Sequence, residues 1–459
     1  MDRKKFEQLE LEIAKDILKD IIMLTNEDTG EVYCKRHGVY EKIPEPRLTS
    51  MVVDAYLDND CKYSRAKKNV TFDFLKSLTI ENTKRIEESN NNTINLSNGV
   101  YFLNEDFEQL HVNNETKERW TTRTNFIHHG MDRPELKNYI SFNQLPIKYI
   151  PEATCPIIDK FMIDVFGKEH VDEIYEFIGY VLLPHVRYQR ALMMIGSGKN
   201  GKSTFIDMIL RFLGINNVSQ ITLQELEGKF AMINIRNKML NVVGDLPTKP
   251  IEDTGNAKRI VTDNVLSGSI KNIQGNFNFN NRCKMMYSVN ELPRTKDSTT
   301  AFFRRWIIKF CDSVFDGKNK DVFILDKLTT DEEMSGLFNQ CLKGIERLEL
   351  NNGFPDNELE VKRIWDLDTN PIAEFVQNKC NIISGIETSS QHIFPAVNEY
   401  RKSKGDYLLK NNSIGYWLRV YGIIGKQRQV DGKYFTFYQD IELIDKEELD
   451  IEGLEWMLK

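Results

Sequence analysis

The stretch that decides the fold is Ala191-Leu-Met-Met-Ile195 followed by Gly196-Ser-Gly-Lys-Asn-Gly-Lys-Ser203. A short apolar run of the first kind is typical of a buried parallel strand. The second fits the pattern G-x4-G-K-[ST], and residues 203–213 continue with helical spacing of apolar side chains. This order of strand, loop and helix predicts a phosphate-binding loop, whose backbone N–H groups and helix N-terminus face an anion. The residues expected to hold a nucleotide are Gly196, Ser197, Gly198, Lys199, Asn200, Gly201, Lys202, Ser203 and Thr204.

Two further apolar runs end in polar side chains suited to nucleotide chemistry. Met239-Leu-Asn-Val-Val-Gly-Asp245 ends in a carboxylate, which can hold Mg²⁺ or polarise the attacking water. Lys284-Met-Met-Tyr-Ser-Val-Asn290 ends in an amide that can orient that water. In the loop itself, Lys202 is expected to bridge the β- and γ-phosphates and Ser203 to place its hydroxyl on Mg²⁺. The set predicts a nucleoside triphosphate site with a magnesium ion.

Helical and strand-like segments alternate from the phosphate loop to about residue 310, which predicts an α/β domain. At roughly 150 residues per domain, a chain of 459 residues is expected to form about three. We place an N-terminal α+β domain at 1–150, a helical segment with the phosphate-loop domain at 151–350, and a C-terminal module with an acidic tail at 371–459. Within the first, residues 3–24 have the spacing of an amphipathic helix and residues 31–43 that of a hairpin.

The C-terminal module combines helical segments with a hairpin signal. Residues 391–404 and 412–421 have helical patterns, and a hairpin follows around the turn Asp431-Gly432. Three helices and a hairpin suggest a winged helix. Residues 399–433 hold eight Lys or Arg against three acids, which favours duplex contact by the second helix and the wing. A packing module with ordinary surface lysines is the alternative. The candidate DNA contacts are Arg419, Lys426, Arg428 and Lys433.

The composition is that of a soluble globular protein, with 41% apolar and 28% charged residues. The net charge of −7 disfavours a protein that coats nucleic acid with its whole surface, so any such contact must be local. No apolar run approaches the roughly 18 residues of a membrane span, and the N-terminus does not have the pattern of a signal peptide. Seven scattered cysteines predict no disulfide framework and a reducing, cytoplasmic location.

The ordered motifs resemble those of superfamily 3 helicases, specifically the phage and plasmid primase–helicase C-terminal family that includes the poxvirus-type enzyme. The resemblance covers most of the chain, and it implies an α/β fold class: an AAA+ (P-loop) parallel-sheet ATPase core, an α+β N-terminal domain and a C-terminal winged helix. The stretches that carry it are Gly196–Thr204, Asn241–Asp245, Ala257–Arg259, Ser288–Pro293 and Ala301–Trp306, with flanking matches at Ser97–Val100, Glu176–Tyr180 and Pro371–Phe375.

The resemblance assigns roles that the local pattern leaves open. Asp245 becomes the Walker B acid and Asn290 the sensor. One of Arg304 and Arg305 becomes an arginine finger that reaches the nucleotide of a neighbouring subunit, whereas on local grounds two adjacent arginines indicate a solvated edge. A finger of this kind implies a ring, expected to be a hexamer, that moves 3′ to 5′ on single-stranded DNA.

The family inserts a hairpin into the central channel, and here that hairpin would lie within residues 268–279. Lys271 is its first candidate for touching DNA phosphate and Asn272 its second. The family usually has Thr-Gly-Asp shortly before, where this chain has Thr262-Asp263-Asn264. A solvent-facing Lys271 is therefore the alternative.

These observations predict an ATP-driven ring helicase for replication of a phage, plasmid or other mobile element. ATP and Mg²⁺ are the expected ligands, with single-stranded DNA in a channel and duplex or origin DNA at the winged helix. The first 150 residues lack an acidic triad suited to a primase, so priming is expected from a separate protein. The alternative is an origin-binding initiator or helicase-loading switch that uses ATP only to assemble. A regulator with a vestigial nucleotide site is disfavoured by the intact phosphate loop.

Overall fold

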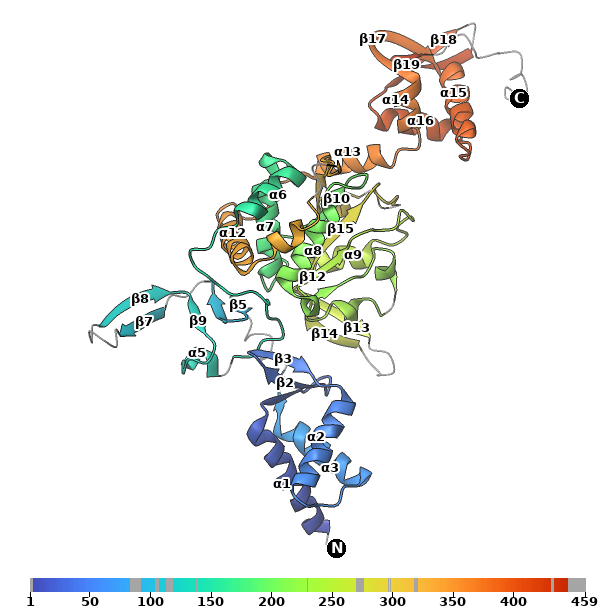
Figure 1. Cartoon of the computed structure of the whole chain (residues 1–459). Helices are drawn as coiled ribbons and strands as arrows, with labels where there is room; N and C mark the ends of the chain where they lie inside the picture. Colours follow the sequence, from blue (N-terminus) through green and yellow to red (C-terminus); the bar gives the residue numbers. More distant parts are fainter. Residues whose placement is uncertain are drawn as a thin grey trace. The chain divides into compact units, whose positions relative to one another are not determined.

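The computed structural model describes residues 3–82, 92–103, 107–112, 119–137, 139–228, 230–269, 276–295, 297, 299–317, 321–430 and 433–444 (Figure 1). The chain forms two compact units. The first comprises residues 1–290 and 295–356, and the second comprises residues 291–294 and 357–459. A further division of the first unit at residue 150 stays a prediction.

The chain begins with three helices and a four-stranded sheet of order β3-β2-β1-β4. The predicted hairpin over 31–43 is confirmed by the antiparallel pair β2–β3. The predicted helix over 3–24 is too long, because Met23–Asn26 forms a buried strand that pairs with β2. The apolar residues of this strand continue the spacing of the preceding helix, and they are also buried as a strand requires. The bounds are α1 Arg3–Asp20, β1 Met23–Asn26, β2 Val32–Arg36, β3 Val39–Lys42, α2 Glu45–Asp58, α3 Arg65–Leu78 and β4 Ile80–Glu81.

Short antiparallel strands follow, in a sheet of order β5-β6-β9 and a separate hairpin β7–β8. Leu96 and Val100 of this sheet are fully buried. Gly38 lies close to this sheet, because the side-chain amide of Asn95 donates to its carbonyl at 3.0 Å. The bounds are β5 Thr93–Leu96, β6 Gly99–Phe102, β7 Phe107–Val112, β8 Arg119–Thr124, β9 Phe126–His128 and α5 Pro134–Lys137.

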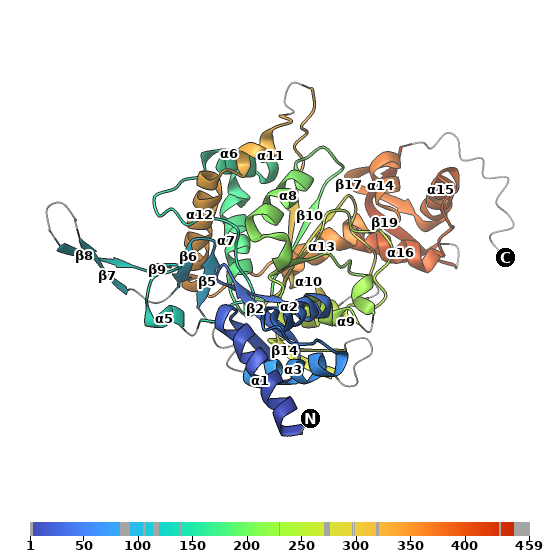
Figure 2. The same ribbon diagram turned by 60° about the horizontal axis from the view of Figure 1, so that its bottom comes forward.

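A five-stranded parallel sheet forms the centre of the first unit, as the alternating pattern predicts. Its order is β11-β12-β15-β10-β16, and every neighbouring pair runs parallel. All residues of β10 are buried, which agrees with its continuous apolar run. Figure 2 shows α8 beside β10. The bounds are β10 Ala191–Ile195, β11 Val218–Ser219, β12 Leu240–Val243, β15 Lys284–Val289 and β16 Trp306–Phe310, with a separate antiparallel pair β13 Val265–Ser269 and β14 Asn276–Asn280.

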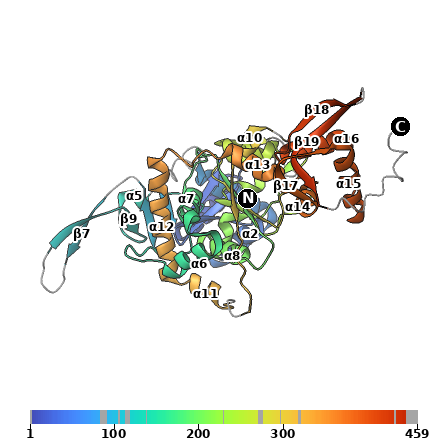
Figure 3. The same ribbon diagram turned by 90° about the horizontal axis from the view of Figure 1, so that it is seen from above.

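Helices cover this sheet, and the longest of those described in the first unit, α12, lies along α7 (Figures 1 and 3). Arg347 of α12 donates to Glu176 of α7 at 2.8 Å. No helix in the described ranges is long and apolar enough to cross a membrane. The bounds are α6 Pro156–Phe166, η1 Lys168–His170, α7 Val171–Leu182, α8 Lys202–Leu213, η2 Ile215–Asn217, η3 Glu225–Glu227, η4 Met232–Ile235, α9 Gly255–Thr262, α10 Thr300–Phe303, α11 Ile324–Leu328 and α12 Asp331–Leu350.

The second unit is a small α+β module with a three-stranded antiparallel sheet of order β17-β19-β18. The two predicted helices and the hairpin strands are present. Strand β17 was not predicted, because its sequence does not alternate between apolar and polar residues. In the structure most of its residues are exposed. The turn Asp431-Gly432 lies outside the described residues. The bounds are α13 Glu358–Asp368, α14 Ala373–Lys379, β17 Cys380–Ser389, α15 Ser390–Ser403, α16 Asn411–Val420, β18 Gly425–Val430 and β19 Lys433–Leu443.

Candidate active site

Three strands of the central sheet bring their carboxyl ends to one edge. Strand β10 lies between β15 and β16, and β12 lies on the other side of β15. The amide of Gly196 donates to the carbonyl of Val289 at 3.1 Å, so the phosphate loop starts beside the end of β15. Parallel strands place the segments that follow them at the same edge, where α/β folds bind ligands. The loop, Asp245 and Asn290 therefore meet, as the sequence predicts.

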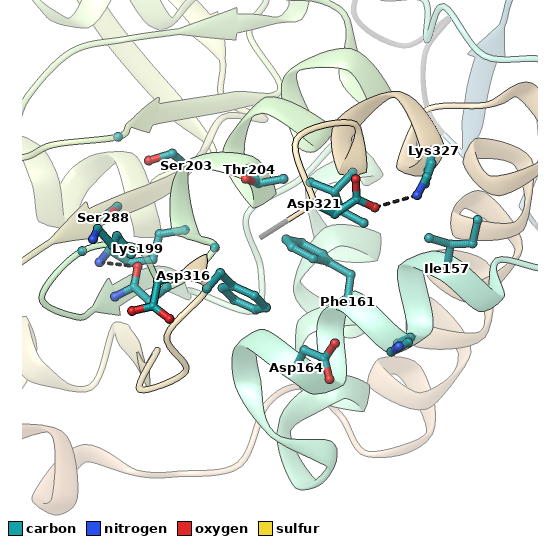
Figure 4. Close-up of a pocket in the computed structure, with 18 of the residues that line it drawn as sticks. Ile157, Phe161, Asp164, Lys199, Ser203, Thr204, Ser288, Asp316, Asp321 and Lys327 are labelled. Atoms are coloured by element: carbon teal, nitrogen blue, oxygen red, sulfur yellow. Dashed lines mark hydrogen bonds and ion pairs between the residues drawn. The ribbon is translucent and has the colours of Figure 1, made fainter. Parts of the chain in front are cut away.

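This edge borders a cavity of about 970 Å³ (Figure 4). The predicted residues that line it include Ser203, Asp245 and Asn290, together with the loop from Gly198 to Thr204. Gly196 and Ser197 do not line it, although Gly196 shapes the loop. All three named side chains are exposed, so they are accessible to a ligand in the cavity.

The loop conformation requires glycine, as Gly201 and Gly196 illustrate. Gly201 has φ of +83°, and a Cβ there would lie 2.6 Å from a methyl carbon of Val165. A Cβ on Gly196 would lie 2.1 Å from the side-chain nitrogen of Asn200. That nitrogen donates to the carbonyl of Cys311 at 3.0 Å, and the amide of Phe315 donates to the carbonyl of Lys199 at 2.7 Å. The segment after β16 thus holds the loop in place.

Lys202 is the best-buried cation of the loop, with 6% of its surface exposed. Its ammonium donates to the carbonyl of Gly196 at 2.5 Å and to the side-chain oxygen of Asn200 at 3.0 Å. Burial lowers the pKa of Lys202, and the nearby Cys311 and Asp245 act in the opposite direction. An anion in the cavity would stabilise the charged ammonium, since the two oxygens that hold it now are neutral.

Sequence reasoning missed the other wall of the cavity. Ile157 and Phe161 of α6, Phe315 after β16 and Ile324 of α11 form an apolar side. In Figure 4 the ring of Phe161 projects from α6 toward the cavity. Their apolar character predicts core packing, which Phe161 also provides, so no sequence signal separates the two roles. The carboxylates on this side are Asp164, Asp316 and Asp321, the last paired with Lys327 at 2.6 Å.

The two candidate finger residues lie at the opposite edge of the sheet. They precede β16, and the carbonyl of Arg305 accepts from the amide of Ala191, the first residue of β10. A strand of this length spans roughly 16 Å. Neither arginine lines the cavity of its own chain.

Burial separates the two arginines from each other. Arg304 is exposed. Arg305 is 8% exposed, and its Nε donates to the hydroxyl of Thr262 at 2.8 Å. Burial lowers the pKa of Arg305, and the neighbouring charge of Arg304 adds to the effect. Arg305 is therefore held within its own fold, whereas the side chain of Arg304 is open to solvent.

The candidate DNA contacts fall in two places. Lys271 and Asn272 lie outside the described residues, between β13 and β14, which pair up to Ser269 and Asn276. In the second unit, Arg419 on α16 and the three basic residues of the hairpin, Lys426, Arg428 and Lys433, are all exposed. Arg428 is engaged by its own module, since it pairs with Glu387 at 2.9 Å and its guanidinium carbon lies 5.1 Å from the ring centroid of Phe437.

The chain is similar to one family model over part of its length and to solved structures at low identity. A family model described as a family of unknown function, DUF5906, matches residues 194–305. No curated protein matches the chain. Among solved structures, the A form apo structure of the NrS-1 C-terminal region is similar at 14% identity and a TM-score of 0.47. The match covers 94% of this chain and 99% of that chain. A second apo structure of the NrS-1 C-terminal region has 13% identity, a TM-score of 0.48 and the same coverage of both chains.

Proposed function

We propose that this chain is an ATP-driven ring helicase of the superfamily 3 type, with an AAA+ core, that acts in replication of a phage, plasmid or other mobile element. One observation carries the proposal. A phosphate loop, an acid and an amide meet in one cavity at the carboxyl edge of a parallel sheet, while Arg304 is exposed at the opposite edge. A site divided in this way is completed by a neighbouring subunit, which supports a ring, and we propose a hexamer.

Four polar residues of the cavity would have tasks in phosphoryl transfer. Lys202 would move from the Gly196 carbonyl to the β- and γ-phosphates of ATP, and Asn290 would orient the attacking water. Asp245 would accept a hydrogen bond from that water or hold Mg²⁺. The hydroxyl of Ser203 and the carboxylate of Asp245 line the same cavity and are oxygen donors of the kind that Mg²⁺ prefers. When bound, Mg²⁺ would neutralise charge on the phosphates.

The test is ATP hydrolysis with and without single-stranded DNA. We expect DNA to raise turnover, and Asp245→Asn to lower it by about 10²-fold or more, because one oriented group of the transition state is lost. Asp207→Asn is the matched control: Asp207 is exposed on α8 and does not line the cavity. Turnover that ignores DNA, with no strand displacement, would contradict the motor. It would favour the alternative, an origin-binding initiator that uses ATP to assemble.

We further propose that the second unit is a winged helix that contacts duplex DNA through α16 and the β18–β19 hairpin. The exposed Arg419 and Lys426 support this role. We expect Arg419→Ala with Lys426→Ala to weaken duplex binding and to reduce the salt slope by about 0.9 for each phosphate that is no longer neutralised. Lys402→Ala, an exposed lysine of α15, is the control. Duplex affinity and salt slope equal to those of the unmodified chain in a titration would show that these side chains are ordinary surface residues.

A further inference from the structure

A second cavity, of about 440 Å³, lies in the N-terminal part of the first unit, away from the nucleotide site. Three chain segments meet there: the end of β2 with its turn, the turn between β5 and β6, and the segment from the end of β9 to α5. Among the described residues, its wall holds four basic side chains and no acidic one. These are Lys35, His37, His129 and Arg133, and the other lining residues are Gly38, Ser97, Gly130, Met131, Leu136 and Tyr139.

Lys35 is a half-buried cation held by neutral groups. Its ammonium donates to the carbonyl of Tyr139 at 3.3 Å and lies 5.8 Å from the ring centroid of Tyr40. Within the part of the chain that the structure describes, no carboxylate lies within ion-pair distance of it. Burial lowers the pKa of Lys35. An anion brought into the cavity would therefore stabilise the charged lysine.

Arg133 is the second cation of the wall, and the Glu135 carboxylate is one of its partners. Its Nε lies 3.3 Å from one oxygen of Glu135, and a terminal nitrogen lies 3.4 Å from the other. Strong charge-assisted bonds are about 2.7–2.9 Å long. Glu135 does not line the cavity. A phosphate, which presents several acceptor oxygens, can thus compete with Glu135 for the guanidinium.

The cavity is held open by hydrogen bonds in its floor. The Nε2 atom of His129 lies 3.0 Å from both the side-chain oxygen of Asn95 and the carbonyl of Leu96. Burial lowers the pKa of His129, so the neutral ring donates from Nε2 to these acceptors and serves as a support. The side chain of Gln144 donates to the carbonyl of His37 at 2.6 Å and fixes the turn on the other side. The site is preformed.

The wall also has an accessible apolar part. Met131 is 39% exposed beside the half-buried Leu136, and His37, Ser97 and Gly130 open to solvent. Cations next to an apolar surface match a nucleotide unit, which has a charged phosphate and a flat base. Because one side of the cavity is open to solvent, the rest of a nucleic-acid strand could extend out of it. A site for a free ion does not need such an opening.

We propose that this cavity binds one nucleotide unit of single-stranded DNA, with Lys35 and Arg133 on its phosphate and Met131 against its base. The choice of DNA as the source of the phosphate rests on the proposed function, whereas the anion site itself rests on the geometry. A contact of this kind would hold the strand at the N-terminal part of the first unit. It would be additional to any contact made by the β13–β14 hairpin.

The experiment is an anisotropy titration of a labelled oligothymidine without nucleotide, over a range of salt concentrations. We expect Lys35→Gln and Arg133→Gln each to weaken binding severalfold, and the double variant to reduce the salt slope by about 0.7, the value for one phosphate of a single strand. Glu135→Gln is expected to strengthen binding, because it removes a carboxylate that competes with the phosphate for the guanidinium. Arg36→Gln is the matched control: Arg36 follows Lys35 on β2, is exposed, and does not line the cavity.

A second measurement locates the contact. An oligothymidine that carries 4-thiothymidine is crosslinked by light, and we expect the adduct in the peptide that contains Met131. Unchanged affinity in both glutamine variants, or no gain in Glu135→Gln, would overturn the proposal. If thymidine monophosphate displaces the labelled oligothymidine as well as the unlabelled oligonucleotide does, the cavity binds a free nucleotide and the proposal of a DNA strand is overturned. ATP hydrolysis by the unmodified chain is measured separately, and its absence would contradict the proposed function while leaving the DNA-binding result intact.

Discussion

Replacement of Lys202 by alanine is expected to lower ATP hydrolysis by about 10²- to 10³-fold, the effect of removing one preorganised donor from a transition state. The ammonium is nearly buried, and the hydrogen bonds that it makes to described residues go to the neutral oxygens of Gly196 and Asn200. It can exchange these for phosphate oxygens with a gain in electrostatic stabilisation, because the surroundings have low polarity. Charge develops on those phosphate oxygens during transfer, so the loss falls on turnover more than on binding.

The control for this variant lies three residues earlier in the same loop. Lys199 is exposed and has φ of +53°, so Lys199→Asn removes its charge while keeping a residue that tolerates this backbone conformation. We expect Lys199→Asn to retain most of the turnover. The measurement is steady-state phosphate release, with nucleotide affinity from a fluorescent analogue. Equal losses in the two variants would indicate that general positive charge, and not the placed Lys202 ammonium, supports hydrolysis.

The polar part of the site could be predicted because its chemistry constrains the residue types. Phosphate loops need glycine where the backbone turns tightly, as at Gly201. A strand-ending Asp is by itself more often a turn residue, and it was the loop motif upstream that pointed to Asp245. The apolar wall could not be predicted. Phe161 and Ile157 have the periodicity of a core helix, and only the fold places them at the cavity. The same limit applies to the basic cavity, since Lys35 and Arg133 are far apart in the chain.

Element boundaries were less predictable than element types. Strand β1 continues the spacing of α1, because buried strands and amphipathic helices both use closely spaced apolar residues. Strand β17 could not be predicted because its apolar residues Ile382 and Ile383 are adjacent in the sequence and do not alternate with polar residues. In the structure both are exposed, 59% and 40%, so this strand has no buried apolar face of the kind that produces alternation. Adjacent residues of the same type also limit what can be predicted from the sequence. Nothing in the sequence distinguishes Arg304 from Arg305, whereas the structure buries Arg305 and exposes Arg304.

Arg304→Ala is expected to abolish hydrolysis in assembled rings, with a loss of about 10³-fold, the lower range for an arginine finger. Arg304 is exposed at the edge of the sheet opposite the cavity that we propose for the nucleotide of its own chain, so we expect its guanidinium to stabilise transition-state charge in a neighbour. Arg305→Ala is the contrast. That side chain is buried and donates to Thr262, so its loss is expected to lower the melting temperature. Light scattering with nucleotide would confirm that the Arg304 variant still assembles.

A mixing experiment separates action on a neighbour from action within one chain. Lys202→Ala subunits lack a working phosphate loop but keep Arg304, and Arg304→Ala subunits have the reverse defect. In a head-to-tail ring formed from equal amounts of both, roughly one interface in four joins an intact loop to an intact arginine. Two preparations that are inactive alone should therefore regain part of the wild-type turnover when mixed and reassembled. If the mixture remains as inactive as its components although the subunits exchange, Arg304 does not serve a neighbouring site, and the ring motor loses its main support.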